Sequence, residues 1–245
     1  LKYFYYGAAP MSVEKLKLAL EVFGPVMIGS YGQTEAPGTI SGLPPAEHFI
    51  GGKRAHDQRL SSVGRPNHLI RVEMMNDANE ILPRGETGEI CVRGDLVMKG
   101  YYKDLEKTAE TIIDGWLHTG DIGNIDSEGY LHITDRKKDM IISGGFNVYP
   151  SEVEQVIWGH PAVQDCAVIG VPDEQWGEAV KAVIELNAGQ TVSAEEIIAL
   201  CKEKLGSVKA PKTVDFIEQL PRSPAGKVLK KELRAEYWQN TERKI

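Results

Sequence analysis

Hydrophobic and polar positions follow a helical period near the start of the chain. Between Ser12 and Phe23, apolar residues recur at the i, i+3, i+4, i+7 spacing of an amphipathic helix, which Ser12 can cap and Gly24 and Pro25 can end. The apolar run 26–28 then predicts a short buried strand that leads into a Gly-rich loop. A helix, a strand and a loop in this order are typical of an α/β layer.

The pattern changes to short β-prone runs between residues 56 and 134. We expect strands at 69–74, 88–93, 97–101 and 131–134, because turn-forming residues separate these runs. Closely spaced strands of this kind predict a small β-barrel or a meander.

The charged stretch 135–139 is the expected domain boundary, so the predicted domains are residues 1–137 and 138–245. Beyond it, Ser151 with Glu154 and Ser193 with Glu196 have the spacing of capping boxes, and each pair precedes a helical apolar pattern. Strands are predicted at 166–171, 179–186 and 213–217, and a loop at 221–227 precedes a basic helix. The second domain is therefore expected to be a small α+β domain.

Composition narrows the class of protein. The 245 residues carry a net charge of −7, which argues against a general nucleic-acid surface, and no apolar run is long enough to span a bilayer. Residues 199–245 carry a net +5, which fits either a solvated helix or a surface that meets phosphate groups. Cys91, Cys166 and Cys201 are odd in number and widely spaced, which favours free thiols in a reducing compartment, and we expect a cytoplasmic protein.

Six segments are richer in Gly, Pro, Thr and charged residues than a plain connector requires. They are residues 6–10, 31–35, 115–121, 135–139, 143–147 and 221–227. Each one alone also fits an ordinary turn or a solvated surface, whereas their order and spacing together are specific.

In this order the segments resemble those of the adenylate-forming superfamily of acyl-CoA synthetases, luciferases and peptide-synthetase adenylation domains. The resemblance covers essentially the whole chain. One motif of the family is absent: the Ser/Thr/Gly-rich phosphate loop ending in Pro-Lys-Gly does not occur in these 245 residues. The chain therefore looks like a truncated, C-terminal half: the end of a large α/β domain (residues 1–55), a β-barrel-like piece (56–134) and a mobile α+β domain.

The resemblance implies an ATP/AMP site. Its residues are Gly7, Ala8, Ala9, Pro10, Tyr31, Gly32, Gln33, Thr34, Asp121 and Arg136. Small residues at 7–9 let adenine lie against the backbone, and Tyr31 is expected to stack on its other face. Asp121 matches the ribose residue, and Arg136 matches a second ribose or phosphate contact.

The resemblance also implies the catalytic groups. Thr34 matches a phosphate contact and Glu35 a ligand of Mg²⁺, a hard cation that takes carboxylates together with substrate phosphates. Lys227 matches the catalytic lysine, whose positive charge stabilises the negative charge that develops on the α-phosphate.

The remaining implied roles concern movement, coenzyme A and the acyl group. Lys138 matches the hinge, and Ser143, Gly144 and Gly145 match the segment along which the pantetheine arm of coenzyme A passes. The acyl pocket is expected to include Gly29, Ser30, Ala36 and Gly38, whose small side chains leave room for a chain or ring.

The resemblance thus implies an acid–thiol ligase that converts a carboxylic acid and ATP into acyl-AMP and then acyl-CoA, with fatty or aryl acids favoured. Residues 1–245 alone are expected to be inactive because they contain no phosphate loop. Three alternatives stay open: an adenylation domain that loads a carrier protein, a luciferase-like oxygenase, and a non-catalytic interaction module. The run 139–150 looks more like acyl-CoA synthetases than like carrier-loading domains.

Overall fold

The computed structural model divides the chain into two compact units, Leu1–Lys137 and Lys138–Ile245. It describes residues 1–9, 11–224 and 226–239. The division falls between the same two residues as the boundary expected from the sequence. A single 3-10 turn, η2 (Lys137–Asp139), carries the chain from one unit into the other.

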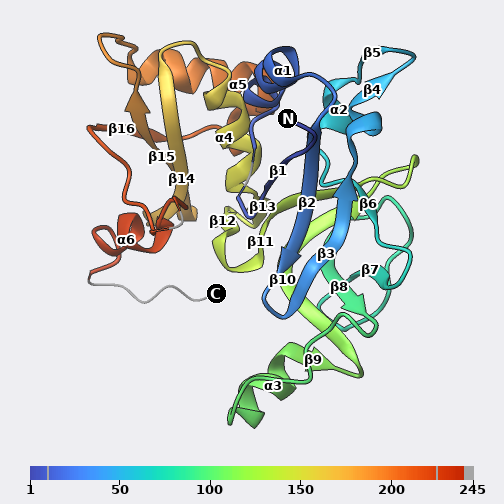
Figure 1. Ribbon diagram of the computed structural model, residues 1–245. Coiled ribbons are helices and arrows are strands. Elements are labelled where there is room, and N and C mark those ends of the chain that lie inside the picture. Colours follow the sequence, from blue (N-terminus) through green and yellow to red (C-terminus); the bar gives the residue numbers. More distant parts are fainter. Residues whose placement is uncertain (10, 225, 240–245) are drawn as a thin grey trace. The chain divides into compact units, whose positions relative to one another are not determined.

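The first unit begins with a four-stranded sheet of order β1-β2-β3-β6 (Figure 1). Its strands are β1 (Phe4–Gly7), β2 (Met27–Gln33), β3 (Ala36–Leu43) and β6 (Arg65–Pro66). β1 runs parallel to β2, and the other pairs are antiparallel. The buried strand predicted at 26–28 is therefore longer than expected and includes part of the predicted loop.

Helix α1 (Val13–Phe23) covers part of this sheet. Ser12 caps it as predicted, since its Oγ accepts from the backbone N–H of Lys15 at 3.2 Å, and Gly24 ends it with φ at 70°. Leu16 and Leu20 pack with Met27 of β2, which confirms the inward face of the helix. Phe23 was expected to be inward as well, but it is half exposed and stacks on Phe4.

A second sheet in this unit has the order β11-β10-β8-β7, with β9 paired to β10. Its strands are β7 (Arg71–Met75), β8 (Gly88–Arg93), β9 (Ile112–Ile113), β10 (Trp116–Ile125) and β11 (Leu131–Arg136). The predicted strands at 69–74, 88–93 and 131–134 are confirmed within one or two residues. The strand predicted at 97–101 is wrong, because that segment is irregular and leads into a helix.

The shorter elements of the first unit lie in its connections. They are η1 (Pro45–His48), β4 (Phe49–Ile50), β5 (Lys53–Arg54), α2 (Asp57–Leu60) and α3 (Leu105–Thr111). The sequence analysis assigned no element to these segments.

The two sheets of the first unit share one apolar core. Tyr31 and Ile40 of the first sheet pack with Ile90, Leu117 and Leu131 of the second. The strand order of the second sheet is open at β7 and β11, so of the two expected arrangements, a barrel or a meander, the described part of the chain has an open antiparallel meander.

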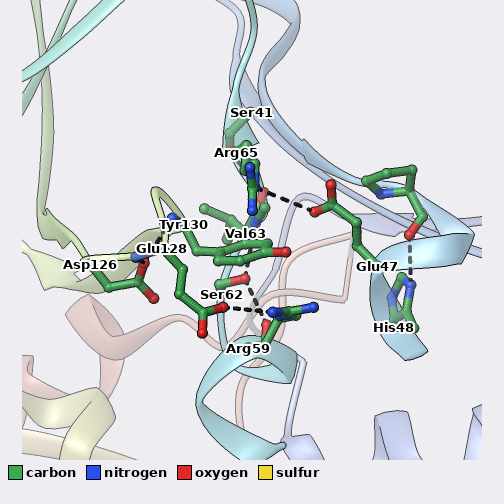
Figure 2. Close-up of polar contacts among 12 residues, drawn as sticks. Ser41, Glu47, His48, Arg59, Ser62, Val63, Arg65, Asp126, Glu128 and Tyr130 are labelled. Atoms are coloured by element: carbon green, nitrogen blue, oxygen red, sulfur yellow. Dashed lines mark hydrogen bonds and ion pairs between the residues drawn. The ribbon is translucent and has the colours of Figure 1, made fainter. Parts of the chain in front are cut away.

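A polar cluster joins the turn between β10 and β11 to the first sheet (Figure 2). The buried ring of Tyr130 lies between two guanidinium groups, with Cζ of Arg59 at 4.8 Å and Cζ of Arg65 at 4.6 Å from its centroid. Arg59 also pairs with Glu128 at 2.6 Å, and Arg65 lies 3.9 Å from Glu47. Cation–π contacts of this kind hold the turn against α2 and β6.

The second unit has a sheet of order β13-β12-β15-β14, with β16 paired to β15 (Figure 1). Its strands are β12 (Ile141–Ser143), β13 (Phe146–Val148), β14 (Val163–Asp173), β15 (Gly177–Leu186) and β16 (Thr213–Ile217). β14 and β15 contain the runs predicted as strands, and β16 has the predicted bounds. β15 and β16 are parallel, and the other pairs are antiparallel.

Both faces of this sheet are covered. Helices α4 (Pro150–Trp158) and α5 (Ala194–Lys209) pack on the face that carries Val168 and Ile184. The region of α6 (Lys230–Ala235) packs on the opposite face. Burial on both faces explains why residues 166–171 of β14 form a continuous apolar run rather than an alternating one.

The two predicted capping boxes have different outcomes. Ser193 and Glu196 form the predicted reciprocal box at the start of α5. The box of Ser151 with Glu154 is wrong, because α4 begins at Pro150 with Tyr149 as its N-cap, so Ser151 lies inside the helix rather than at its cap. Glu154 is buried and instead accepts from the backbone N–H of Val168 at 2.7 Å.

Among the described residues, no helix combines the length and the apolar character needed to cross a bilayer. The three cysteines are free and buried, as expected. Burial raises the pKa of Cys91 to about 12, with a further contribution from Glu89, and burial raises the pKa of Cys201 to about 11. These thiols are therefore protonated and unreactive at neutral pH.

Candidate functional site

Three residues from three separate predicted motifs meet at the carboxylate of Asp121. This side chain is only 3% exposed and lies within β10. The Tyr31 hydroxyl donates to Asp121 Oδ2 at 2.6 Å, and Arg136 Nε lies 2.6 Å from Asp121 Oδ1. Asp121 and Arg136 are cross-strand neighbours of β10 and β11, and Tyr31 comes from β2 in the other sheet. The shared core of the two sheets therefore brings the three residues together.

The electrostatics of this cluster keep Tyr31 a hydrogen-bond donor. Burial, followed by the negative charge of Asp121, raises the pKa of Tyr31 far above its ordinary value. Arg136 is half exposed, so its guanidinium can also reach a ligand. A carboxylate accepts about four hydrogen bonds. Asp121 can therefore accept from Tyr31 and Arg136 at the same time.

Thr34 and Glu35 form the turn between β2 and β3. Thr34 is exposed and Glu35 is half-buried. Tyr101 donates its hydroxyl proton to Glu35 Oε1 at 2.6 Å, and the backbone N–H of Met98 donates to the carbonyl of Glu35 at 2.7 Å. The hydrogen bond to Glu35, together with burial, raises the pKa of Tyr101. The sequence analysis missed Tyr101 because it placed that residue in a strand.

A single divalent cation fits the donor set at Glu35. In the described part of the chain, no group of three or more His, Cys, Asp or Glu side chains is close enough to hold a metal by itself. Mg²⁺ commonly takes one carboxylate and completes its shell with substrate phosphates and water. One fixed carboxylate beside an exposed hydroxyl is consistent with that mode of binding.

Gly7, Ala8 and Ala9 are exposed at the end of β1. A Cβ atom at Gly7 would lie 2.5 Å from the carbonyl oxygen of Ser30, so the close approach of β1 to β2 itself requires glycine there. Ala8 has φ at 63°, in the left-handed region. Pro10, also expected in this segment, lies outside the described residues.

Gly32 and Gln33 were expected in a loop but lie in β2. A Cβ atom at Gly32 would lie 2.8 Å from the carbonyl oxygen of Gly38. The close approach of β2 to β3 therefore accounts for this glycine.

The four residues expected to line an acyl pocket have different surroundings. A Cβ atom at Gly29 would lie 2.8 Å from the Tyr6 hydroxyl, which bonds to the ring of His48 at 2.9 Å. Ala36 is fully buried in the shared core. Both therefore have packing roles. Ser30 is partly exposed, and Gly38 is exposed with φ at 90°.

Glu89 on β8 is a buried residue that the sequence analysis missed. Its Oε1 accepts from the backbone N–H of Gly120 at 3.0 Å, and its Oε2 lies 3.3 Å from Lys137 Nζ and 3.2 Å from His118 Nδ1. It therefore connects the turn before Asp121 to the last residue of the first unit. The Gly-Glu pair at 88–89 opens a predicted strand, and nothing in the pattern indicated its partners.

In the second unit, Ser143, Gly144 and Gly145 form the tight connection between β12 and β13. Ser143 is buried and pairs with Phe146, so the loop has two residues, Gly144 and Gly145, with φ at 57° and 81°. Two-residue hairpins favour glycine because both positions need positive φ. A Cβ atom at Gly144 would lie 2.5 Å from the ring of Trp176, whereas Gly145 faces open space.

Lys227 lies in the predicted loop before α6, and its side chain is exposed. Its backbone is held, since Lys227 N–H donates to Ser223 Oγ at 3.2 Å and its carbonyl accepts from Ser223 N–H at 2.8 Å. Lys138, the expected hinge, is the first residue of the second unit and lies in η2. The roles of Lys138 and Lys227 in a common site remain predictions.

Comparison with known proteins agrees with the family resemblance. The model of the AMP-binding enzyme family matches residues 1–102, and the model of the AMP-binding enzyme C-terminal domain matches residues 152–227. The chain therefore belongs to the adenylate-forming superfamily, in its acyl-CoA synthetase branch.

Three proteins similar to this chain illustrate the range of reactions among its relatives. A medium/long-chain fatty-acid–CoA ligase of Mycobacterium tuberculosis is 44% identical over 98% of this chain and 42% of its own length. A fatty acid–[acyl-carrier-protein] ligase of Streptomyces coeruleorubidus is 40% identical over 98% of this chain and 45% of its own length. The solved structure of the amide bond synthetase McbA from Marinactinospora thermotolerans has a TM-score of 0.90 and 40% identity, covering 97% of this chain and 47% of that one.

The chain thus spans less than half the length of these relatives. Their names specify three different outcomes: a ligase for coenzyme A, a ligase for an acyl-carrier protein and a synthetase of amide bonds. The acceptor used with this chain is therefore a separate question from family membership.

Proposed function

We propose that the whole protein is an ATP-dependent acid–thiol ligase that makes acyl-AMP from a carboxylic acid and transfers the acyl group to coenzyme A. The observation that best supports this is the meeting of Tyr31, Asp121 and Arg136, which come from three motifs of an adenylate site. The expected fold belongs to the same proposal: unit 1 would be the end of a large domain, and unit 2 a small mobile domain.

In the first half-reaction, an oxygen of the substrate carboxylate attacks the α-phosphorus of ATP and pyrophosphate leaves. Asp121 would accept hydrogen bonds from the ribose hydroxyls, while Arg136 would contact the ribose or a phosphate. Thr34 would donate to an α-phosphate oxygen. Glu35 would hold Mg²⁺, which when bound supplies positive charge to the phosphates.

Lys227 would supply the remaining positive charge. Two anions, a carboxylate and a phosphate, must approach each other, and charge grows on the phosphate oxygens in the transition state. A fixed cation stabilises that negative charge, and the site does not have to reorganise at the moment of reaction. The exposed ammonium of Lys227, on a loop with a fixed backbone, suits this role.

In the second half-reaction, the thiol of coenzyme A releases its proton to solvent and its sulfur attacks the acyl carbonyl carbon, and AMP leaves with the electrons of the acyl–phosphate bond. We propose that unit 2 rotates about Lys138 between the two steps, which withdraws Lys227 and brings Ser143, Gly144 and Gly145 to the site. Alternating closure of this kind lets one cleft run two chemistries.

The remaining residues would contact adenine or the acyl group. Gly7, Ala8 and Ala9 would lie beside adenine, and Tyr31 would stack on it. Ser30 and Gly38 are better candidates than Gly29 and Ala36 for contact with the acyl group, because they are not enclosed by packing. We also propose a cytoplasmic location, and that residues 1–245 alone make no acyl-CoA because they contain no Gly-rich phosphate loop.

Pyrophosphate exchange by the whole protein tests the first half-reaction. A panel of fatty and aryl carboxylic acids would be screened for acid-dependent exchange between pyrophosphate and ATP. Exchange with at least one acid supports adenylate formation. If no acid supports exchange and no acyl-AMP analogue binds by calorimetry, the protein is a non-catalytic module instead.

The acceptor would then be tested by supplying free coenzyme A, a phosphopantetheinylated carrier protein or a primary amine to the acid that exchanges best. Faster product formation with coenzyme A supports the proposal. The carrier-loading alternative has a specific basis in the 40% identity to an acyl-carrier-protein ligase, and faster loading of the carrier would establish it.

A further inference from the structure

The loop that carries Lys227 closes on itself. Residues Arg222 and Val228 face each other in an antiparallel bridge, and the backbone N–H of Leu229 donates to the carbonyl of Pro221 at 2.8 Å. Ser223 bonds to Lys227 through both backbone and side chain, as described above. These contacts join the two ends of the loop, but they do not by themselves attach it to the sheet.

The side chain of Arg222 makes that attachment. Its Nη2 forms an ion pair with Asp165 Oδ2 and lies 3.9 Å from Glu185 Oε2. Its Nη1 donates to the carbonyl of Gly226 at 3.2 Å. One guanidinium therefore connects two carboxylates of the sheet to the residue directly before Lys227.

Both carboxylates are themselves held in place. Glu185 on β15 is 6% exposed, and its Oε2 also accepts from the backbone N–H of Leu220 at 3.0 Å. Asp165 on β14 accepts from the indole N–H of Trp158 and from the backbone N–H of Cys166, both at 2.8 Å. The anchor of Arg222 is thus a pair of cross-strand neighbours on β14 and β15 of the sheet.

A guanidinium suits this arrangement for geometric reasons. Its planar fork can bind carboxylates with one nitrogen and a carbonyl oxygen with the other at the same time. A lysine ammonium at this position could pair with Asp165, but it is a point charge without a second arm for Gly226.

We propose that Arg222 is a positioning residue for Lys227: it fixes the peptide before the lysine to the sheet, and so sets where the ammonium stands during adenylate formation. This inference rests on the proposed function, because it gives Lys227 its role in the first half-reaction. Arg222 itself need not contact ATP or the acid.

The test separates the two half-reactions in the whole protein. We expect Arg222→Ala to lower kcat for acid-dependent pyrophosphate exchange by about 10²-fold, since a small displacement of a catalytic group costs about that much. The KM for ATP should stay unchanged, and thioester formation from supplied acyl-AMP should keep the wild-type rate. Arg222→Lys should recover part of the lost kcat.

Lys209→Ala is the matched control. It removes another ion pair of the same unit, between Lys209 of α5 and Glu152 of α4, which does not touch the loop. It should leave both half-reactions unchanged. Thermal unfolding of each variant reports any loss of fold, and if Arg222→Ala unfolds, the ratio of the two half-reactions in Arg222→Lys decides the question.

The positioning role is overturned if Arg222→Ala leaves exchange unchanged, or if it lowers both half-reactions by the same factor. A failure of the proposed function looks different. In that case the wild-type protein shows no exchange with any acid, or Lys227→Ala exchanges as well as the wild type.

Discussion

The hydroxyl of Tyr31 donates to Asp121 Oδ2 at 2.6 Å across 90 residues of sequence, inside the core that the two sheets of the first unit share. Tyr31 belongs to β2 and Asp121 to β10, so the contact depends on how one sheet packs on the other. The hydrogen bond orients the buried carboxylate of Asp121. A ligand that donates to Asp121 would therefore bind an acceptor whose orientation is already fixed.

Tyr31→Phe should therefore cost stability. It removes a hydrogen bond to the carboxylate of a residue that is 3% exposed, and a hydrogen bond to a charged group contributes about 1.5–3 kcal/mol. We expect the free energy of unfolding of the 245-residue chain, from urea denaturation, to fall by that amount. Tyr5→Phe, at an exposed position of β1, is the control and should have no measurable effect. Equal stability of the two variants would show that the bond does not matter for the fold.

Lys227→Ala in the whole protein should lose adenylate formation and keep thioester formation from supplied acyl-AMP. The lysine stabilises negative charge that develops only in the first step, so its loss should lower the rate of exchange by about 10²–10³-fold. Pyrophosphate exchange and thioester yield, measured side by side, check this. Equal losses in both assays would contradict the assigned role.

Gly145→Leu should show the opposite selectivity. The position faces open space, so a leucine would not strain neighbouring packing, but its side chain would stand where pantetheine is proposed to pass. Exchange should remain near the wild-type rate while the yield of acyl-CoA falls.

Backbone strain is the alternative cause in that experiment, because Gly145 has φ at 81°. Gly189→Leu controls for it, since Gly189 also faces open space and has φ at 75° in another loop of the same unit. If both leucine variants lose the same yield of acyl-CoA, strain rather than obstruction is responsible.

The stability of the second unit should fall at low pH through Asp215. Burial raises the pKa of this carboxyl, but hydrogen bonds from Lys181 at 2.7 Å and Tyr237 at 2.5 Å outweigh it, so the pKa lies below its ordinary value of 3.8. A depressed pKa stabilises the fold above the pKa of the unfolded state, and this contribution is lost as pH falls through the pKa of the folded state.

The measurement compares wild type with Asp215→Asn by chemical unfolding at several pH values. The difference between their free energies of unfolding should be constant from about pH 5 to 7 and should shrink below about pH 4, where the unfolded carboxyl protonates. A difference that does not change over this range would mean that the Lys181–Asp215 pair adds nothing to stability.

Much of the second unit was predictable because its signals are local. The box of Ser193 with Glu196 and the strand at 213–217 depend on neighbouring residues, and both were found in the structure. Glu154 has the same local spacing from Ser151, but its carboxylate bonds to Val168, fourteen residues away. A tertiary partner thus overrode the local pattern.

The candidate site shows the same division. The motifs supplied Tyr31, Asp121 and Arg136, while Tyr101 and Glu89 were missed. Tyr101 bonds to Glu35 across 66 residues, and Glu89 to Gly120 across 31. Such contacts follow from how strands and loops far apart in sequence pack together, on which residue spacing carries no information.

The last prediction is that residues 138–245 fold without the rest of the chain. Both faces of their sheet are buried by elements of the same unit: α4 and α5 cover one face, and the region of α6 covers the other. The two strands with the longest pairing, β14 and β15, lie inside the unit, as do the anchors of the Lys227 loop. A domain of about 100 residues with its own core usually unfolds as one cooperative transition. We expect a single sigmoidal urea transition that coincides by fluorescence and circular dichroism. Ile157→Ala should lower the midpoint, because truncating that buried side chain leaves a cavity and lowers the free energy of unfolding by about 2–5 kcal/mol. Non-coincident transitions, or an Ile157→Ala variant as stable as the parent, would show that this unit needs the first one to fold.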